Sequence, residues 1–288
     1  MGVGLVLSGC ADLAYYRQAA AGQWELLHAS RPVAEVLADP ATSPELRQRL
    51  ETTRELRTFA SAELALPDNA SYRYYADIGR PYVVKNVFAA PELSLEPRHW
   101  CFWIVGCLSY RGYFDAEAAH RLADELRASG DDVYVADISA YSTLGWFADP
   151  LLNTFIRWPP GRLAELIFHE LAHQRLYIAD DSAFNEAFAT AVGRLGAERW
   201  LERRGVAGER VEYATDVRRR EEFLRLVADA REQLAAVYAS AWSDADKRAA
   251  KQRILAKLRV HHGALKQDWN GYAGYDRWFE RDLNNAKL

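Results

Sequence analysis

Apolar positions in the first quarter of the chain recur three and four residues apart. Over residues 11–65 this spacing includes Val33 and Val36 and continues beyond Pro40 and Pro44. Residues three or four apart lie on one face of a helix, so the pattern predicts two or three helices that pack against a core. The two prolines are expected to separate these helices.

The pattern changes between residues 72 and 108, where β-branched and aromatic residues gather in short runs separated by Pro and Gly. Such runs are typical of β-strands. Residues 115–129 return to helical spacing and are closed by Gly130, and residues 133–135 predict another strand. A further strand is predicted over residues 141–147.

The remainder of the chain is helical in pattern. Four helices are predicted over 161–177, 182–204, 215–242 and 243–262. Their expected N-caps are Ser182, Thr215 and Ser243, and their expected stops are Gly205 and Gly263. The sequence therefore predicts an α+β fold with a mixed or antiparallel sheet followed by a helical C-terminal half. We expect one domain over 11–288, made of a helical segment (11–65), a sheet region (66–150) and a helical region (151–288).

Composition excludes several classes of protein. Of the 288 residues, 50% are apolar and the formal net charge is −4. Such a chain has enough apolar surface to fold, so it is not a disordered or low-complexity protein. Without a basic face it is not expected to bind nucleic acid. No run approaches 18 uncharged apolar residues, so no membrane-spanning helix is expected.

The three cysteines differ in their surroundings. Cys10 ends a short apolar run that closes in small residues, whereas Cys101 and Cys107 stand six residues apart in one extended stretch. Cysteines so placed are too far apart to bridge unless Gly106 bends the chain sharply. The sequence therefore predicts that Cys101 and Cys107 are two buried free thiols.

The chemistry is concentrated in a His-Glu-x-x-His motif at residues 169–173, inside a predicted helix. Two histidines four residues apart lie one above the other on a helix, so both imidazoles can reach one metal ion. Glu170 between them is placed to act on water at that ion. His169 and His173 are therefore candidate zinc ligands, and Glu170 is the candidate general base.

Glu186 is the candidate third ligand. It follows His173 by thirteen residues, and an antiparallel helix pair with a turn at 179–181 would bring it back level with His173. Two imidazoles and one carboxylate leave a fourth position for water, as in hydrolytic zinc sites. Asn185 and Thr190 are candidates for orienting a ligand. The alternatives are core or surface histidines, a carboxylate near a helix start, and a packing or capping role for Thr190.

These motifs carry a family resemblance. The metal motif with its downstream Glu resembles the gluzincin class of zinc peptidases, and the whole chain resembles a family of predicted aminopeptidases found as bacterial lipoproteins. The shared motifs are Tyr-Arg-Gly-Tyr-Phe at 110–114, Ala-Tyr-Ser-Thr-Leu-Gly-Trp-Phe at 140–147, His-Glu-Leu-Ala-His-Gln at 169–174, Phe-Asn-Glu at 184–186, Gly-Tyr-Asp-Arg-Trp-Phe at 274–279 and Leu-Asn-Asn-Ala at 283–286.

The resemblance implies a zincin-like fold with one Zn²⁺ and a peptide substrate. Residues 141–147 would then form the edge strand that pairs with the substrate backbone, with Tyr141 beside it and Gly145 allowing close approach, or else a plain core strand. Peptide cleavage also needs a donor for the developing oxyanion, and Tyr275 is the candidate, with a structural tyrosine as the alternative.

The run Leu-Val-Leu-Ser-Gly-Cys at 5–10 looks like a lipobox, in which Cys10 would be lipidated, and residues 1–10 would then be the remnant of a lipoprotein signal. Only nine residues without Lys or Arg precede Cys10, which is shorter than a full signal peptide. A chance cysteine is the alternative. Lipidation would anchor the protein to a membrane of the bacterial cell envelope, facing the periplasm.

The sequence thus predicts a zinc aminopeptidase. Two other functions remain open at this point: an envelope endopeptidase or amidase, and a zinc-stabilised envelope scaffold without turnover. Exopeptidase activity rests on the resemblance, since the carboxylate that would hold a substrate's free ammonium group is not evident among Asp137, Asp149 and Glu165.

Overall fold

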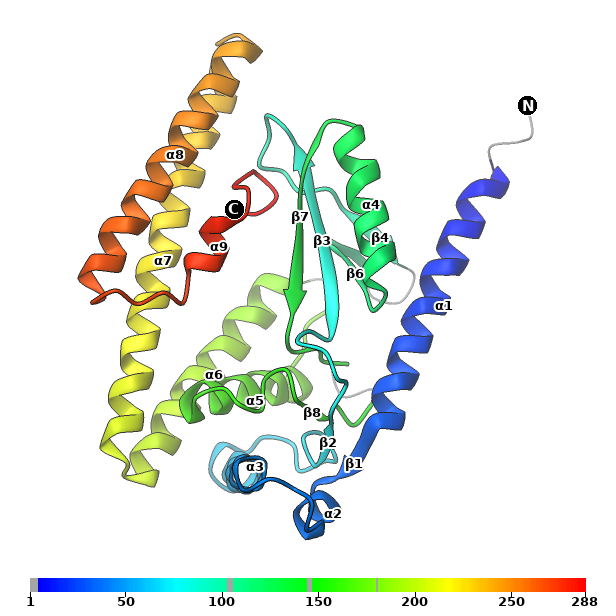
Figure 1. The fold of residues 1–288 in the computed structure, drawn as a ribbon, viewed down its shortest axis with the longest axis vertical. Coiled ribbons are helices and arrows are strands. Elements are labelled where there is room, and N and C mark those ends of the chain that lie inside the picture. The colour runs from blue at the N-terminus through cyan, green and yellow to red at the C-terminus, as the bar shows by residue number, and fades with distance from the viewer. Residues whose placement is uncertain (1–4, 103–105, 144–146, 180) are drawn as a thin grey trace. The chain divides into compact units, whose positions relative to one another are not determined.

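The computed structural model describes residues 5–102, 106–143, 147–179 and 181–288 (Figure 1). Gly145 lies outside these residues. The chain divides into two compact units, each built from two stretches. The first unit comprises Met1–Val84 and Asp137–Ala214, and the second comprises Lys85–Ala136 and Thr215–Leu288. The predicted single domain over 11–288 stays a prediction.

The first unit is mainly helical. Its elements are α1 (Leu5–Ala29), β1 (Ser30–Pro32), α2 (Val33–Ala38), α3 (Pro44–Leu64), β2 (Tyr74–Ala76), β8 (Leu151–Leu152), α5 (Pro160–Arg175) and α6 (Ser182–Arg204). The three strands form a small sheet in the order β1-β2-β8, antiparallel between β1 and β2 and parallel between β2 and β8. The sequence predicts two or three helices before residue 65, and the structure describes three there. Pro44 starts α3 instead of ending a helix, because Pro suits the first turn.

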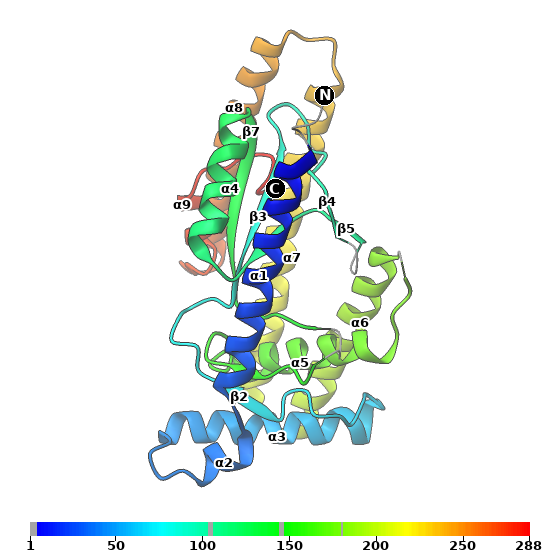
Figure 2. The ribbon, with the colours of Figure 1, turned by 90° about the vertical axis from the view of Figure 1, so that its right-hand side faces the viewer.

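Close packing of α5 on α6 determines where the candidate ligands lie. Figure 2 shows both helices near α3. A Cβ atom at Gly193 would lie 2.7 Å from the backbone oxygen of Glu165, and one at Gly196 would lie 2.8 Å from the Phe168 ring. Phe168 in turn stacks on Phe59 of α3, with 5.9 Å between ring centroids. Glycine therefore lets α6 approach α5 directly beside the His-Glu-x-x-His motif.

The second unit combines a sheet with a helical hairpin. Its elements are β3 (Val84–Pro91), β4 (Trp100–Phe102), β5 (Gly106–Leu108), β6 (Arg111–Tyr113), α4 (Ala116–Ala128), β7 (Asp131–Ile138), α7 (Ala207–Ala239), α8 (Asp244–Asp268) and α9 (Asp276–Glu280). One end of β3, of β7 and of α7 belongs to the first unit. The sheet order is β6-β3-β7, and β4 and β5 form a separate hairpin. Apolar side chains from α7, α8, α9 and the C-terminal segment form one core, which includes Leu234, Leu255 and Leu283.

The late Leu-Asn-Asn-Ala motif has a structural role in the second unit. The Asn285 backbone N–H donates to Asp132 (2.8 Å), its side-chain amide donates to the Glu92 carbonyl (2.8 Å), and its Oδ1 accepts from Tyr238 (2.8 Å). Lys251 donates to the same Asp132 carboxylate at 2.6 Å. Because these groups are mostly buried and paired, Asn285 fixes the chain end against β7 and α7.

The prediction of buried free thiols is wrong. Cys101 and Cys107 are exposed and joined by a disulfide between β4 and β5, where they are paired residues with Cα atoms 3.9 Å apart. The cause is Gly106, whose φ of 73° lets the chain reverse within six residues.

Several helix limits also differ from the prediction. Thr215 lies inside α7, and Gly263 lies inside α8, which continues to Asp268. Asp181, and not Ser182, caps α6 through its side chain. An internal Gly costs a helix only about 1 kcal/mol, so α8 can continue through Gly263 and this residue does not mark its end.

The α+β class is confirmed, with small sheets and a helical C-terminal half. Residues 141–143 and 147 are not in a strand, so the described part of the predicted edge strand is absent. The helices that the structure describes are all too short or too polar to span a membrane.

Candidate metal centre

Three side chains from α5 and α6 converge on one point. The Nε2 atoms of His169 and His173 lie 3.1 Å apart, and the Glu186 carboxylate oxygens lie 3.5 Å from each of them. One ligand atom from each residue lies within 4.8 Å of the others. The structure therefore brings together the three residues that the spacing selected.

The surroundings of the cluster suit a metal ion. The side chain of His173 is 5% exposed and that of His169 is 21% exposed, whereas Glu186 is 65% exposed and opens the cluster to solvent. Burial lowers the pKa of both imidazoles, while the Glu186 charge opposes that effect on each. The histidines are thus neutral near pH 7, the form in which imidazole binds metal. Two nitrogen atoms and one carboxylate are a donor set that Zn²⁺ accepts with one position left open.

The turn between α5 and α6 is held by the buried side chain of Asn185. Its Oδ1 accepts from the Ile178 N–H (2.8 Å), and its Nδ2 donates to the Ile178 carbonyl (2.7 Å). Both polar groups of Ile178 are therefore taken by one amide. Because Asn185 precedes Glu186, this pair of hydrogen bonds helps to position the candidate ligand Glu186 relative to His173.

Replacing Asn185 with Ala is expected to weaken Zn²⁺ binding by about 10- to 100-fold, the usual effect of losing a group that orients a ligand. The loss of a buried hydrogen-bonding partner should also lower the free energy of unfolding by about 1–3 kcal/mol. Competition with a fluorescent chelator and thermal unfolding measure the two effects. Ser182→Ala, an exposed change in the same turn, should alter neither quantity. Equal behaviour of the two variants would show that Asn185 does not position Glu186.

Glu170 lies beside a second buried carboxyl group. Its carboxyl group hydrogen-bonds to Ser142, and the Ser142 hydroxyl also lies 3.1 Å from Asp149. Asp149 further accepts from the Thr143 backbone (3.1 Å) and hydroxyl (2.7 Å). Burial raises the pKa of Glu170 to about 7, and the Ser142 hydrogen bond opposes that rise. Glu170 can therefore both accept and release a proton near neutral pH.

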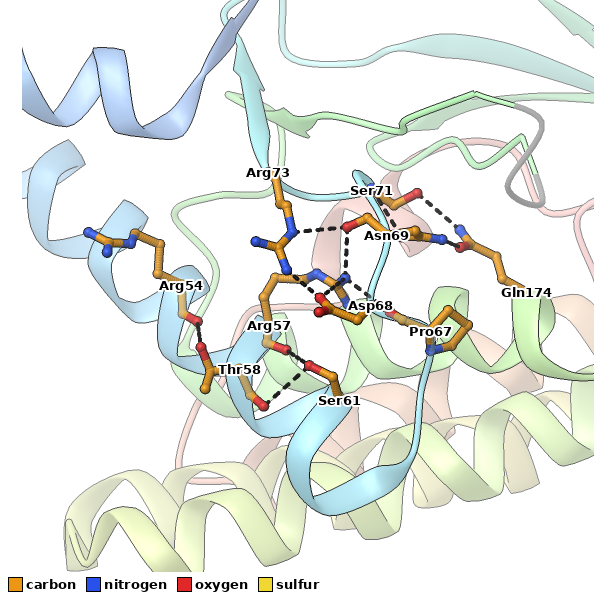
Figure 3. Close-up of polar contacts among 10 residues, drawn as sticks. All are labelled: Arg54, Arg57, Thr58, Ser61, Pro67, Asp68, Asn69, Ser71, Arg73 and Gln174. Carbon is orange, nitrogen blue, oxygen red and sulfur yellow. Dashed lines mark hydrogen bonds and ion pairs between the residues drawn. The ribbon is translucent and has the colours of Figure 1, made fainter.

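The loop over residues 67–73 is hydrogen-bonded both to α3 and to the C-terminal end of α5, the helix that carries the His-Glu-x-x-His motif (Figure 3). Gln174, next to His173, accepts from Asn69 at 2.7 Å and donates to Ser71 at 3.3 Å. Buried Arg57 of α3 donates to the carbonyls of Pro67 (3.0 Å) and Asn69 (3.1 Å). The loop thus fastens the C-terminal end of α5 to α3.

Tyr72 continues this loop toward Glu170. Its backbone has φ of 62°, a left-handed conformation that is costly for a bulky residue, and its N–H donates to the Asp149 carbonyl at 2.7 Å. Its ring is buried, and desolvation, with the nearby Glu170 and Asp149 charges, raises the pKa of its hydroxyl well above 10. Sequence reasoning missed Tyr72 and Ser142, because only tertiary folding brings them to the motif helix.

The other predicted site residues do not belong to the cluster of His169, His173 and Glu186. Tyr141 is exposed and adjoins Ser142, and Thr190 is exposed on α6. Asp149 is engaged as described, and Glu165 accepts from Tyr213 at 3.0 Å. Tyr275 belongs to the second unit, where its ring stacks on Phe223 with centroids 4.3 Å apart. Its role as oxyanion donor stays a prediction, as do those of Tyr141 and Thr190.

Comparison with known families gives one match. The family model described as "Putative aminopeptidase" matches residues 14–288. The chain belongs to this aminopeptidase family. No curated protein and no solved structure matches it.

Membership in the aminopeptidase family confirms the resemblance at the level of a peptidase. The match begins after Cys10, so the lipid site is not part of it. It covers both units of the aminopeptidase-family chain, including the ligand cluster and the C-terminal motifs. The zincin-like fold stays a prediction.

Proposed function

We propose that the protein is a zinc-dependent aminopeptidase that cleaves the peptide bond next to a free N-terminus. The observation that carries this proposal is the convergence of His169, His173 and Glu186, with the Glu170 carboxyl group beside them. Family membership supports peptide bonds as the substrate and a free N-terminus as the point of attack. His169, His173 and Glu186 would hold the ion.

The mechanism follows from the placement of the side chains. Zn²⁺, when bound, supplies Lewis acidity that polarises the scissile carbonyl and acidifies water. Glu170 takes the proton of the attacking water and delivers it to the leaving amine as the C–N bond breaks. Ser142 has a single hydroxyl proton, which it donates to Asp149 or to ionised Glu170. Protonated Glu170 instead donates to the Ser142 oxygen, so Ser142 can hold Glu170 in place in both states.

The experiment that tests this function combines metal analysis with hydrolysis assays. The purified protein should contain one zinc per chain and cleave aminoacyl peptides but not the same peptides with a blocked N-terminus. Absence of bound zinc would overturn the proposal. Cleavage of only the blocked peptides would identify an endopeptidase, and zinc without any turnover would identify a scaffold.

Proton release on metal binding gives a pH-dependent test. Because the pKa of Glu170 is about 7, about half of this group is protonated at pH 7. A divalent cation beside it lowers its pKa and expels that proton. Adding Zn²⁺ at pH 7 should therefore release about half a proton more from the wild type than from Glu170→Gln, and the difference should fall to about a tenth of a proton near pH 8. Calorimetry in buffers of different ionisation enthalpy measures the number of protons released. Equal proton release from the two proteins at pH 7 would show that burial does not raise the pKa of Glu170.

We further propose that the protein lies in the bacterial cell envelope, facing the periplasm and lipid-anchored through Cys10. The Cys101–Cys107 disulfide supports an oxidising compartment. Cys10→Ser is expected to shift the protein from the membrane fraction to the soluble fraction, as immunoblotting of fractionated cells would show. Cys107→Ser serves as the control and should leave the distribution unchanged. Membrane retention of the Cys10→Ser protein would exclude the anchor.

A further inference from the structure

Four exposed apolar side chains border the candidate metal centre. Leu176, Tyr177, Ile178 and Phe184 are each 40–52% exposed, and we call them the apolar ledge. Three are consecutive and follow His173 closely, and the fourth stands two residues before Glu186. Large apolar side chains gathered in water mark interaction sites more often than scattered ones do.

Hydrogen bonds hold the backbone that carries part of this ledge. The Leu176 N–H donates to the Ala172 carbonyl at 3.0 Å, and Leu176 has an extended backbone. Ile178 is fixed at both its N–H and its carbonyl by Asn185. On α6, Phe184 stacks on Phe188 with centroids 6.1 Å apart. The ledge thus stands on ordered backbone in the segment that links the candidate ligands His173 and Glu186.

The local charges favour one kind of occupant. Among the described residues over 175–186, Asp181 and Glu186 carry carboxylates and Arg175 carries the cationic side chain. An anionic lipid surface attracts clusters of Lys and Arg, so this net negative segment is poorly suited to it. Since Glu186 would bind the metal ion, the Asp181 carboxylate is the group left to attract the positively charged free amine of a peptide. An apolar first side chain of that peptide complements the ledge.

We infer that the apolar ledge binds the side chain of the substrate's N-terminal residue, so that peptides beginning with a large apolar residue are preferred. This inference rests on the proposed function, which places the scissile bond at His169, His173 and Glu186. Leu176, Tyr177, Ile178 and Phe184 then determine specificity without taking part in the proton transfers.

Binding without turnover tests the inference. Zinc-loaded Glu170→Gln protein is titrated by calorimetry with Leu-Ala-Ala and Ala-Ala-Ala. Partial burial of the larger side chain should make the Leu peptide bind about tenfold more tightly. Adding Tyr177→Ser and Phe184→Ser should reduce that ratio to about twofold. Leu195→Ser, which changes an apolar residue of α6 that is 65% exposed, is the matched control and should preserve the ratio.

The outcomes separate the inference from the proposed function. An unchanged Leu-to-Ala ratio in the ledge variants would overturn the inference even if the wild type hydrolyses peptides. Binding of the same proteins to phosphatidylglycerol vesicles is measured in parallel. If the ledge variants lose vesicle binding while the Leu-to-Ala ratio is unchanged, the ledge binds a lipid surface and the inference is overturned. A ledge-dependent ratio in a wild-type protein that hydrolyses no peptide would support the ledge and overturn the proposed activity.

Discussion

Replacing Glu170 with Gln is expected to lower kcat for aminoacyl-peptide hydrolysis by about a thousandfold while the zinc content stays at one ion per chain. Gln has nearly the same size and can still hydrogen-bond to Ser142, but it cannot take a proton from water. General acid–base catalysis of this kind contributes about 10²- to 10⁴-fold to the rate. Because Glu170 is not among the three converging ligands, the metal should remain.

The comparison variant for this experiment is Glu198→Gln. Glu198 lies on α6 in the same unit, where it pairs with Arg194 at 3.6 Å on the surface. Removing this charge should change neither kcat nor zinc content, since exposed pairs contribute little. Steady-state kinetics and elemental analysis on both variants complete the test. A Glu170→Gln protein with wild-type kcat would show that another group accepts the proton.

Replacing His173 with Ala is expected to weaken Zn²⁺ binding by more than about 100-fold and to remove activity in proportion. Losing a group that merely orients a ligand weakens binding by 10- to 100-fold, so the loss of a ligand weakens it further. His173 is buried, and its removal also leaves a cavity. Titration with Zn²⁺ against a competing chelator measures the affinity.

Glu186→Ala separates metal loss from unfolding. Its side chain is mostly exposed, so the fold should persist while zinc affinity falls. His261→Ala, which removes an exposed histidine of α8, should bind zinc as the wild type does. Wild-type affinity in both His173→Ala and Glu186→Ala would refute the ligand set.

The convergence of the three candidate ligands could be predicted from sequence because its geometry is local. His169 and His173 share one helix face, and a short turn returns the chain to Glu186, so helix periodicity and turn length suffice. The limits of α6, from Ser182 to Arg204, agree with the prediction for the same reason.

The groups around Glu170 could not be predicted, because they come from distant segments. The β-branched and aromatic pattern predicts a strand at Tyr72, whereas its backbone is left-handed and its N–H donates to the distant Asp149 carbonyl. Ser142 and Asp149 carry no local signal that relates them to Glu170. The Cys101–Cys107 disulfide likewise depended on one dihedral angle at Gly106.

The division of each unit into two stretches of chain has a consequence for folding during synthesis. All residues of the first unit, including every candidate ligand, have been made once Ala214 leaves the ribosome. Residues 85–136 of the second unit must wait for α8 and the segment around Asn285, which supply their partners Lys251 and Asn285. Since chains fold progressively as they emerge, the unit with the candidate metal centre can fold first, while strands β3, β6 and β7 wait without their helical partners.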